Sequence, residues 1–359
     1  MRDRGWTVVI VTRVSEYAEA IHGEGFQLQP LRFFRRKIQF PWLEMASFLE
    51  VLHVYLMHRP QIVHQVAFKP VLYGTLAARL VKVPVIVNAL AGMGFLFTST
   101  RKSIALAKQI ALILMKALFR TRRVYMIVQN PEDQATMLKK KLVPPGRLAL
   151  IRGSGVDLQQ FAFRPEPEGK PIVVMLAARM LWHKGVREFV EAAKAIREIK
   201  GPDEVRFVLV GGPDPENPAG IPEEQLLAWQ KAGIVEWWGQ RKDMPQVLAQ
   251  AHVVCLPSYR EGLPKVLLEA AAIGRPLVAT DTVGCREVVR PGFNGFLVPV
   301  QDPDALAKAL LRLVDAPQLR REMGQQGRKI VEEEFSQDIV VRKTLALYRE
   351  ALKGKGYAW

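Results

Sequence analysis

The sequence predicts an α/β protein made of two doubly wound domains, each a parallel sheet with helices packed on it. Short β-branched runs alternate with amphipathic stretches, which is the pattern of βαβ units. The alternation occurs twice, on either side of a Pro-rich, charged stretch at residues 161–171. The 359 residues are also more than a single hydrophobic core usually holds.

The first series contains four expected strands, at residues 7–12, 61–66, 84–90 and 124–130. A helical stretch at residues 70–82 follows the second of them. The opening MRDRG is typical of the end of a helix with its terminal glycine, whereas a doubly wound domain normally opens with a strand, a glycine turn and a helix. We therefore expect the first strand and the glycine loop of this domain to be missing.

The second series contains five expected strands, at residues 171–179, 205–212, 252–258, 276–280 and 295–299. The expected domains are residues 1–160 and 161–336, joined by the 161–171 stretch, with residues 337–359 packing back onto the first domain. A ligand should bind in the cleft between two such domains, at the carboxyl ends of the strands.

The composition excludes several classes of protein. With 49% hydrophobic and 24% charged residues, the chain is globular rather than disordered. Its two cysteines, Cys255 and Cys285, indicate a reducing compartment and argue against disulfides or a zinc site. The longest apolar run, at residues 104–119, is interrupted by Lys108 and Lys116 and is too short to span a bilayer. We therefore expect a cytoplasmic protein.

Positive charge is concentrated in the first half of the chain. Residues 1–160 carry 23 Lys and Arg against 9 Asp and Glu, whereas the rest carries 28 against 26. The strongly basic first half suggests a polyanionic partner, either nucleic acid or an anionic membrane surface. Residues 32–42 and 101–123 interleave cations with bulky apolar side chains and match no nucleic-acid-binding motif, which favours the membrane. Packing of these stretches inside their own domain, or a solvated charged face, is the alternative.

The stretch EGLPKVLLEAAAIGRP, residues 261–276, holds two glutamates, Glu261 and Glu269, with seven residues between them. Pro264 suits the first turn of a helix. The backbone N–H groups of Gly262, Leu263 and Lys265 would then point outward at the positive end of the helix dipole, where phosphate binds. A surface turn followed by a charged helix face is the alternative.

Upstream, Arg179 and Lys184 lie in LAARMLWHKG, between an expected strand and an expected helix. Two fixed cations at such a junction match a diphosphate, because the guanidinium binds it bidentately and the ammonium acts as a point charge. Basic residues in a solvated loop are the alternative.

Together these segments resemble the donor half of the retaining family-four glycosyltransferases, which have the GT-B fold. The resemblance covers residues 150–315 and rests on AARMLWHKGV, LVGG, WWGQRKDMP, PSYREGLPKVLLEAAAIGRPLVATDTVGCREVV and NGFLVP. In the first half, HQVAFKPVLYGTLAARL and NALAGMGFLF are similar to the subgroup that adds hexoses or N-acetylhexosamines to polyprenyl-linked saccharides.

The resemblance implies roles for individual residues. Arg179 and Lys184 would neutralise the leaving diphosphate, Glu269 would bind the ribose, and Glu261 would bind the transferred sugar. His64 would lie near the sugar and the acceptor. The other implied donor-binding residues are Gly211, Arg241, Met244, Gly262, Leu263, Pro264 and Lys265, and the implied acceptor-side residues are Lys69 and Gly92.

We therefore expect a membrane-associated, retaining hexosyltransferase that uses a UDP-linked sugar to extend a lipid-linked glycan, without a metal or other cofactor. Three alternatives remain at this point. The chain could be an inactive homologue that binds the sugar nucleotide without transfer, a nucleic-acid-binding protein that uses its basic half, or a sugar-nucleotide epimerase of the same fold.

Overall fold

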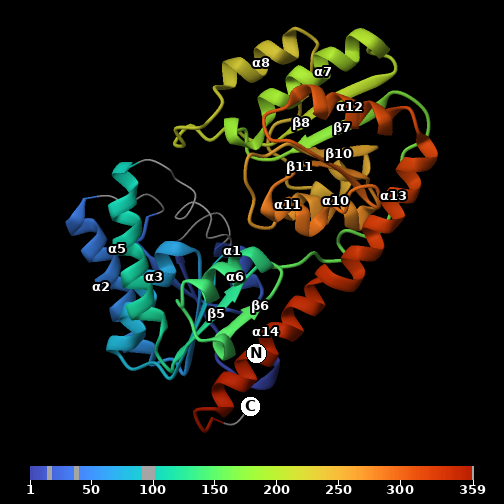
Figure 1. Ribbon diagram of the computed structural model, residues 1–359. Helices are drawn as coiled ribbons and strands as arrows, with labels where there is room; N and C mark the ends of the chain where they lie inside the picture. The colour runs from blue at the N-terminus through green and yellow to red at the C-terminus, as the bar shows by residue number, and fades with distance from the viewer. Residues whose placement is uncertain (14–17, 36–39, 91–101, 358–359) are drawn as a thin grey trace. The chain divides into compact units, whose positions relative to one another are not determined.

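The computed structural model describes residues 1–13, 18–35, 40–90 and 102–357 and is shown in Figure 1. The chain forms two compact units. Unit 1 contains Met1–Ile151 and Arg342–Trp359, and unit 2 contains Arg152–Val341. The boundary after residue 160 that the sequence suggested therefore moves back to Ile151.

Unit 1 opens with the short 3-10 helix η1 (Arg2–Arg4), which ends at Gly5 with a left-handed φ of 80°, as the glycine predicted. Strand β1 (Val9–Arg13) pairs in parallel with β2 (Gln27–Leu31), and α1 (Ala18–Gly23) lies between them in the chain.

The main sheet of unit 1 is parallel, with the order β3-β4-β5-β6. Its strands are β3 (Ile62–Val66), β4 (Val85–Leu90), β5 (Val124–Val128) and β6 (Leu148–Leu150). Its helices are α2 (Pro41–His58), α3 (Phe68–Leu80), α5 (Lys102–Phe119), α6 (Pro131–Lys139) and the 3-10 turn η2 (Pro145–Arg147). The strands predicted at residues 61–66, 84–90 and 124–130 are confirmed, whereas β2 and β6 had no clear signal.

Unit 2 is a six-stranded parallel sheet with the order β12-β11-β10-β7-β8-β9. Its strands are β7 (Ile172–Ala177), β8 (Val205–Val210), β9 (Glu236–Trp237), β10 (Val253–Leu256), β11 (Leu277–Thr280) and β12 (Gly295–Val298). Its helices are η3 (Trp182–Lys184), α7 (Val186–Lys200), α8 (Glu223–Lys231), α9 (Met244–Ala249), α10 (Lys265–Ile273), α11 (Val283–Val288), α12 (Pro303–Val314), α13 (Pro317–Ile330) and the π-helical turn η4 (Val331–Phe335). The last helix, α14 (Gln337–Lys353), begins in unit 2, and its residues from Arg342 onward belong to unit 1.

The helices of unit 2 cover both faces of its sheet (Figure 1). One apolar cluster packs α7, α8 and α12 against one face, and another packs α9, α10 and α11 against the other. The strand order reverses between β7 and β10, because the chain leaves one edge of the sheet after β9 and returns beside β7. A doubly wound sheet binds its ligand at the carboxyl ends of the strands at this reversal.

The 161–171 stretch is not the loose linker that its composition suggested. It belongs to unit 2, and two buried arginines hold it. Arg275 donates to the backbone carbonyls of Arg164 and Pro165, and Arg320 forms an ion pair of 2.9 Å with Glu166. Its proline and charged residues are therefore parts of a packed surface strap, which sequence composition alone cannot distinguish from a linker.

Candidate active site

The two loops of unit 2 that hold predicted site residues meet at the reversal of its strand order. Arg179 and Lys184 follow β7, and Glu261 follows β10. The Nζ atom of Lys184 lies 2.5 Å from Oε1 of Glu261, and their side chains are only 18% and 12% exposed. This half-buried ion pair joins the two sequence motifs that were singled out independently. It lies where a doubly wound sheet binds its ligand.

Helix α10 presents an uncapped amino end beside this pair. Pro264 is its N-cap residue, one position earlier than expected, and no side chain caps the helix. Within the described chain, the backbone N–H groups of Gly262, Leu263 and Lys265 have no hydrogen-bond partner. Such N–H groups at the positive end of the helix dipole favour an anion, so this loop is suited to phosphate.

Glu269 lies in the second turn of the same helix and is buried, at 8% exposure. Burial raises the pKa of its carboxyl group, and the cation of Lys265, whose Nζ lies 3.3 Å from Oε1, partly opposes this effect. Lys265 itself is largely exposed, so the pair contributes little to stability. A carboxylate held this way has acceptor capacity left for the hydroxyl groups of a ligand.

The charges around Lys184 also act on the neighbouring His183. Burial lowers the pKa of the neighbouring His183, and the cations of Lys184 and Arg179 lower it further, while Glu261 opposes them. Arg179 is half-exposed, and its Nη1 lies 2.7 Å from Oδ2 of Asp214. His183 is a site residue that the sequence analysis did not single out, although it stands next to Lys184.

Two glycines allow the loops of the site to approach each other. A Cβ at Gly185 would lie 2.0 Å from the carbonyl oxygen of Pro257, and one at Gly211 would lie 1.8 Å from that of Ala178. The carbonyl oxygen of Gly211 also accepts a hydrogen bond from the indole of Trp237. The structure therefore gives Gly211 a packing role, and its contact with the donor stays a prediction.

The segment that holds the predicted donor-binding residues Arg241 and Met244 contains an ion pair of its own. Arg241 forms a bidentate pair with Asp243, with distances of 2.8 and 2.6 Å. Met244 begins α9 and packs against the apolar cluster on that face of the sheet. Leu263 lies against Gly153, where a Cβ would come within 2.6 Å of its side chain. The loop before α10 is thus packed in place.

The acceptor-side residues predicted in unit 1 are engaged within that unit. His64 hydrogen-bonds Tyr348 of α14, and partial desolvation lowers the pKa of its imidazole, although the residue as a whole stays exposed. Lys69 pairs with Glu44 of α2 at 2.7 Å and donates to the carbonyl of Arg35. Gly92 lies outside the described residues. A role for these three in acceptor binding stays a prediction.

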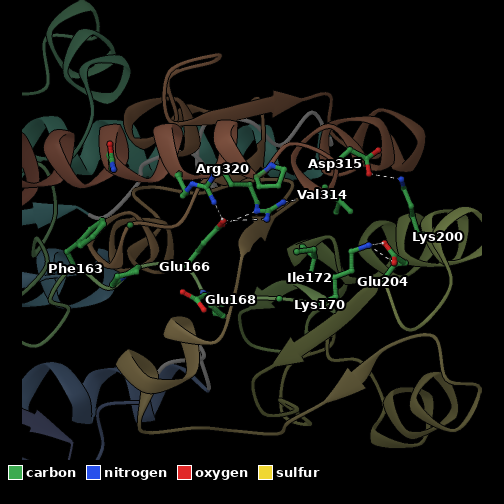
Figure 2. Close-up of a pocket in the computed structure, with 17 residues that line it drawn as sticks. Phe163, Glu166, Glu168, Lys170, Ile172, Lys200, Glu204, Val314, Asp315 and Arg320 are labelled. Atoms are coloured by element: carbon green, nitrogen blue, oxygen red, sulfur yellow. Dashed lines mark hydrogen bonds and ion pairs between the residues drawn. The ribbon is translucent and has the colours of Figure 1, made fainter.

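A cavity of about 800 Å³ lies at the opposite end of the unit 2 sheet, beside the 161–171 stretch (Figure 2). Its cations are matched by carboxylates: Lys170 pairs with Glu204, Lys200 with Asp315, and Arg320 with Glu166. Helices α10 and α12 end there, and the carboxyl end of a helix repels anions. A diphosphate is therefore not expected in this cavity.

Among the residues that the structure describes, no group of three or more His, Cys, Asp and Glu side chains is placed to hold a metal ion. That the reaction needs no metal stays a prediction. No described helix is long and apolar enough to cross a bilayer.

Comparison with known proteins decides the family. Residues 171–316 match the model of group 1 glycosyl transferases, and residues 1–130 match that of glycosyl transferase 4-like domains. An Escherichia coli galactosyltransferase, UDP-Gal:α-D-GlcNAc-diphosphoundecaprenol α-1,3-galactosyltransferase, is 31% identical over 285 residues, which are 76% of this chain and 71% of that protein. This chain belongs to the family-four glycosyltransferases. It is a glycosyltransferase enzyme with the GT-B fold.

Other relatives extend the comparison. A Campylobacter jejuni enzyme, N,N′-diacetylbacillosaminyl-diphospho-undecaprenol α-1,3-N-acetylgalactosaminyltransferase, is 26% identical to this chain. The match covers 98% of this chain and 93% of the Campylobacter jejuni enzyme. Sucrose-phosphate synthase from Thermosynechococcus elongatus has a TM-score of 0.78 at 22% identity, covering 98% of this chain and 91% of that one. Anabaena HepE in complex with UDP has a TM-score of 0.72 at 16% identity, covering 95% of this chain and all of that one. The fold of the whole chain is thus that of a GT-B enzyme.

Proposed function

We propose that this glycosyltransferase moves a hexose or N-acetylhexosamine from a UDP-linked sugar to a saccharide carried on a polyprenyl diphosphate. The reaction retains the anomeric configuration and serves the synthesis of a cell-surface polysaccharide or glycoconjugate. One observation carries the proposal: the Lys184–Glu261 pair lies at the strand reversal, beside the unpartnered N–H groups that precede α10.

In this proposal, each charged group of the site has a defined role. When the bond between the anomeric carbon and the phosphate oxygen breaks, negative charge builds up on the leaving diphosphate. Lys184, Arg179 and the N–H groups before α10 stabilise that charge. Glu261 holds the hydroxyls of the transferred sugar, and Glu269 holds those of the ribose.

Retention requires no carboxylate nucleophile in this scheme. The acceptor hydroxyl attacks from the face that the phosphate leaves, and the departing phosphate takes its proton. Glu261 is already engaged by Lys184, which suits a residue that positions the sugar better than one that attacks it.

The donor and acceptor classes are supported by the relatives. The Escherichia coli and Campylobacter jejuni enzymes are named for diphosphoundecaprenol-linked saccharides, and the former for a UDP-sugar. Anabaena HepE was solved with UDP and with UDP-glucose. Because a polyprenyl acceptor stays in the bilayer, we place the enzyme at the inner face of the cell membrane.

The first test is the thermal stability of the protein with UDP, GDP or ADP. A nucleotide at about 100 times its Kd should stabilise the fold by about 2.7 kcal/mol. We expect UDP alone to do so, and we expect Glu269→Ala to abolish the effect. The control is Glu332→Ala, which removes the i,i+4 partner of Arg328 on an exposed surface. Stabilisation by UDP that survives in Glu269→Ala would contradict the site.

The second test is transfer to a short-chain polyprenyl-diphosphate saccharide, with the anomeric configuration of the product read by NMR. An inverted product would contradict the mechanism. UDP binding without transfer would indicate the inactive homologue, and an epimerised sugar nucleotide formed without acceptor would indicate the epimerase. Salt-dependent RNA binding without any nucleotide effect would favour the nucleic-acid-binding alternative.

A further inference from the structure

Helix α2 is apolar on two opposite faces. Its inner face buries Val51, Val54 and Tyr55 in the core of unit 1. A stripe on its other face is exposed and is formed by Trp42, Met45, Leu49, His53, Leu56 and Met57. Most of these positions recur at intervals of three or four residues, so they follow one side of the helix. We call this set the α2 stripe.

The exposure within the stripe is large for apolar side chains. Trp42 is 65% exposed, Met45 57%, Leu56 56% and Leu49 51%. At the start of the helix, Phe40 stacks on Trp42 with ring centroids 4.7 Å apart, and both rings face solvent. A helix that is apolar all round is normally buried on all sides, and a contiguous exposed apolar surface marks an interaction site.

Exposed apolar side chains also occur on segments near α2. Phe33 is 48% exposed, and its backbone N–H donates to Glu50 of α2, so it lies beside the helix. Helix α3 packs against both α2 and α5 (Figure 1), and Ile113 and Leu114 of α5 are 68% and 51% exposed.

Apart from Glu44 and Glu50, the charged residues of α2, α3 and α5 and of the segments at their ends are basic. No member of the stripe is acidic, and the two acids of α2 are occupied elsewhere: Glu44 pairs with Lys69, and Glu50 accepts from the backbone of Arg32 and Phe33. The exposed cations Arg32 and Arg35 precede α2, Arg59 caps its end, Lys82 follows α3, and Lys116 and Arg120 lie at the end of α5.

We propose that the α2 stripe is the surface that inserts into the interface of an anionic bilayer, with the surrounding cations on the lipid headgroups. Apolar side chains with an aromatic pair at one end suit the headgroup boundary, and cations beside them suit anionic lipid. A second copy of the chain is a poorer partner, because it would bring two cationic surfaces together. The choice of a bilayer rests on the proposed lipid-linked acceptor.

The experiment uses vesicles without donor or acceptor, so its failure is separable from failure of the proposed function. The full-length protein is mixed with phosphatidylcholine vesicles that contain phosphatidylglycerol, and the bound fraction is measured by sedimentation. We expect Met45→Ser/Leu49→Ser/Leu56→Ser to weaken binding by about tenfold or more, because each change removes inserted apolar surface. The control is Ile199→Ser/Leu227→Ser, which removes comparably exposed apolar side chains from unit 2.

A second measurement tests the proposal independently of the triple variant, whose weaker binding could also result from poor folding. Cys255 and Cys285 are fully buried, so a polarity-sensitive dye would label Leu49→Cys selectively. We expect its emission to shift to the blue with anionic vesicles and to return with added salt, whereas labelled Ile199→Cys should not respond. Unchanged emission at Leu49→Cys would overturn the proposal. So would equal binding to neutral vesicles, or a wild-type dimer that the triple variant dissociates while vesicle binding persists.

Discussion

Glu269 lies buried in the second turn of α10, where its charge is costly in the ligand-free protein. Burial raises the pKa of its carboxyl group. The folded state therefore binds more protons than the unfolded state between the ordinary carboxyl pKa and the raised one, and stability falls as pH rises through that window. A buried carboxylate that only stabilised the fold would be expected to have a full set of partners within the protein. The destabilised carboxylate of Glu269 instead suits a residue whose remaining partners are the hydroxyl groups of a ligand.

We predict that Glu269→Gln raises the Tm of the ligand-free protein at about pH 8 and that the gain shrinks toward about pH 4. A gain of about 1 kcal/mol would shift Tm by about 2–4 °C in a unit of this size. Glu332→Gln, at an exposed position, serves as the control and should leave Tm unchanged. A lower Tm for Glu269→Gln at the alkaline end would show that the charge stabilises the fold.

For single residues, the sequence suggested which side chains belong to the candidate site, but not which of them are in contact. The structure places the residues of the two motifs in one unit. Arg179, Lys184 and Glu261 lie after β7 and β10, and Glu269 lies in α10. The sequence could not show that Lys184 and Glu261 form an ion pair, since that contact joins residues far apart in the chain. His183 was missed because the effect of its neighbours on its pKa is a property of three-dimensional packing.

The loops of the proposed donor site require a close backbone approach at the junction of η3 and α7. Gly185 has a left-handed φ of 74°, and a Cβ there would lie 2.0 Å from the carbonyl oxygen of Pro257. That oxygen belongs to the loop that leads to Glu261. The two loops of the site can therefore meet only if residue 185 has no side chain.

We predict that Gly185→Ala destabilises the protein far more than Gly233→Ala and abolishes stabilisation by UDP. Gly233 has a similar φ of 67°, but a Cβ there would meet only open space, so it isolates the cost of the left-handed backbone. That cost is about 1–2 kcal/mol. Thermal melts of both variants, with and without UDP, measure the difference. Equal losses of Tm in Gly185→Ala and Gly233→Ala would show that the contact with Pro257 adds no destabilisation of its own.

Among the elements, the longer strands of both main sheets were the most predictable, because β-branched runs bounded by turns have few alternatives. The strands β6 and β9, of three and two residues, gave no such run and were missed. The 161–171 strap and the outer face of α2 were not foreseen. A strap held by Arg275 and Arg320 has the composition of a linker, and a helix that is apolar on both faces gives no periodic signal to distinguish a core from a docking surface.

At the scale of the whole molecule, the apolar clusters respect the division into units. Among the described residues, the two clusters that cover the faces of the unit 2 sheet contain only residues of unit 2, and the third contains only residues of unit 1. Unit 2 is also one continuous stretch of chain, whereas unit 1 needs two. A continuous stretch with its own core is expected to fold alone.

We predict that the fragment Arg152–Val341 folds on its own, is stabilised by UDP and does not bind anionic vesicles. The residues proposed for the donor, including Lys184, Glu261 and Glu269, all lie in this fragment, whereas the α2 stripe and most of the excess positive charge do not. Circular dichroism, thermal melts with UDP and vesicle sedimentation, each run beside the full chain, test the three parts. A folded fragment that UDP does not stabilise would mean that nucleotide binding needs unit 1. Vesicle binding by the fragment would remove the basis for assigning that role to α2.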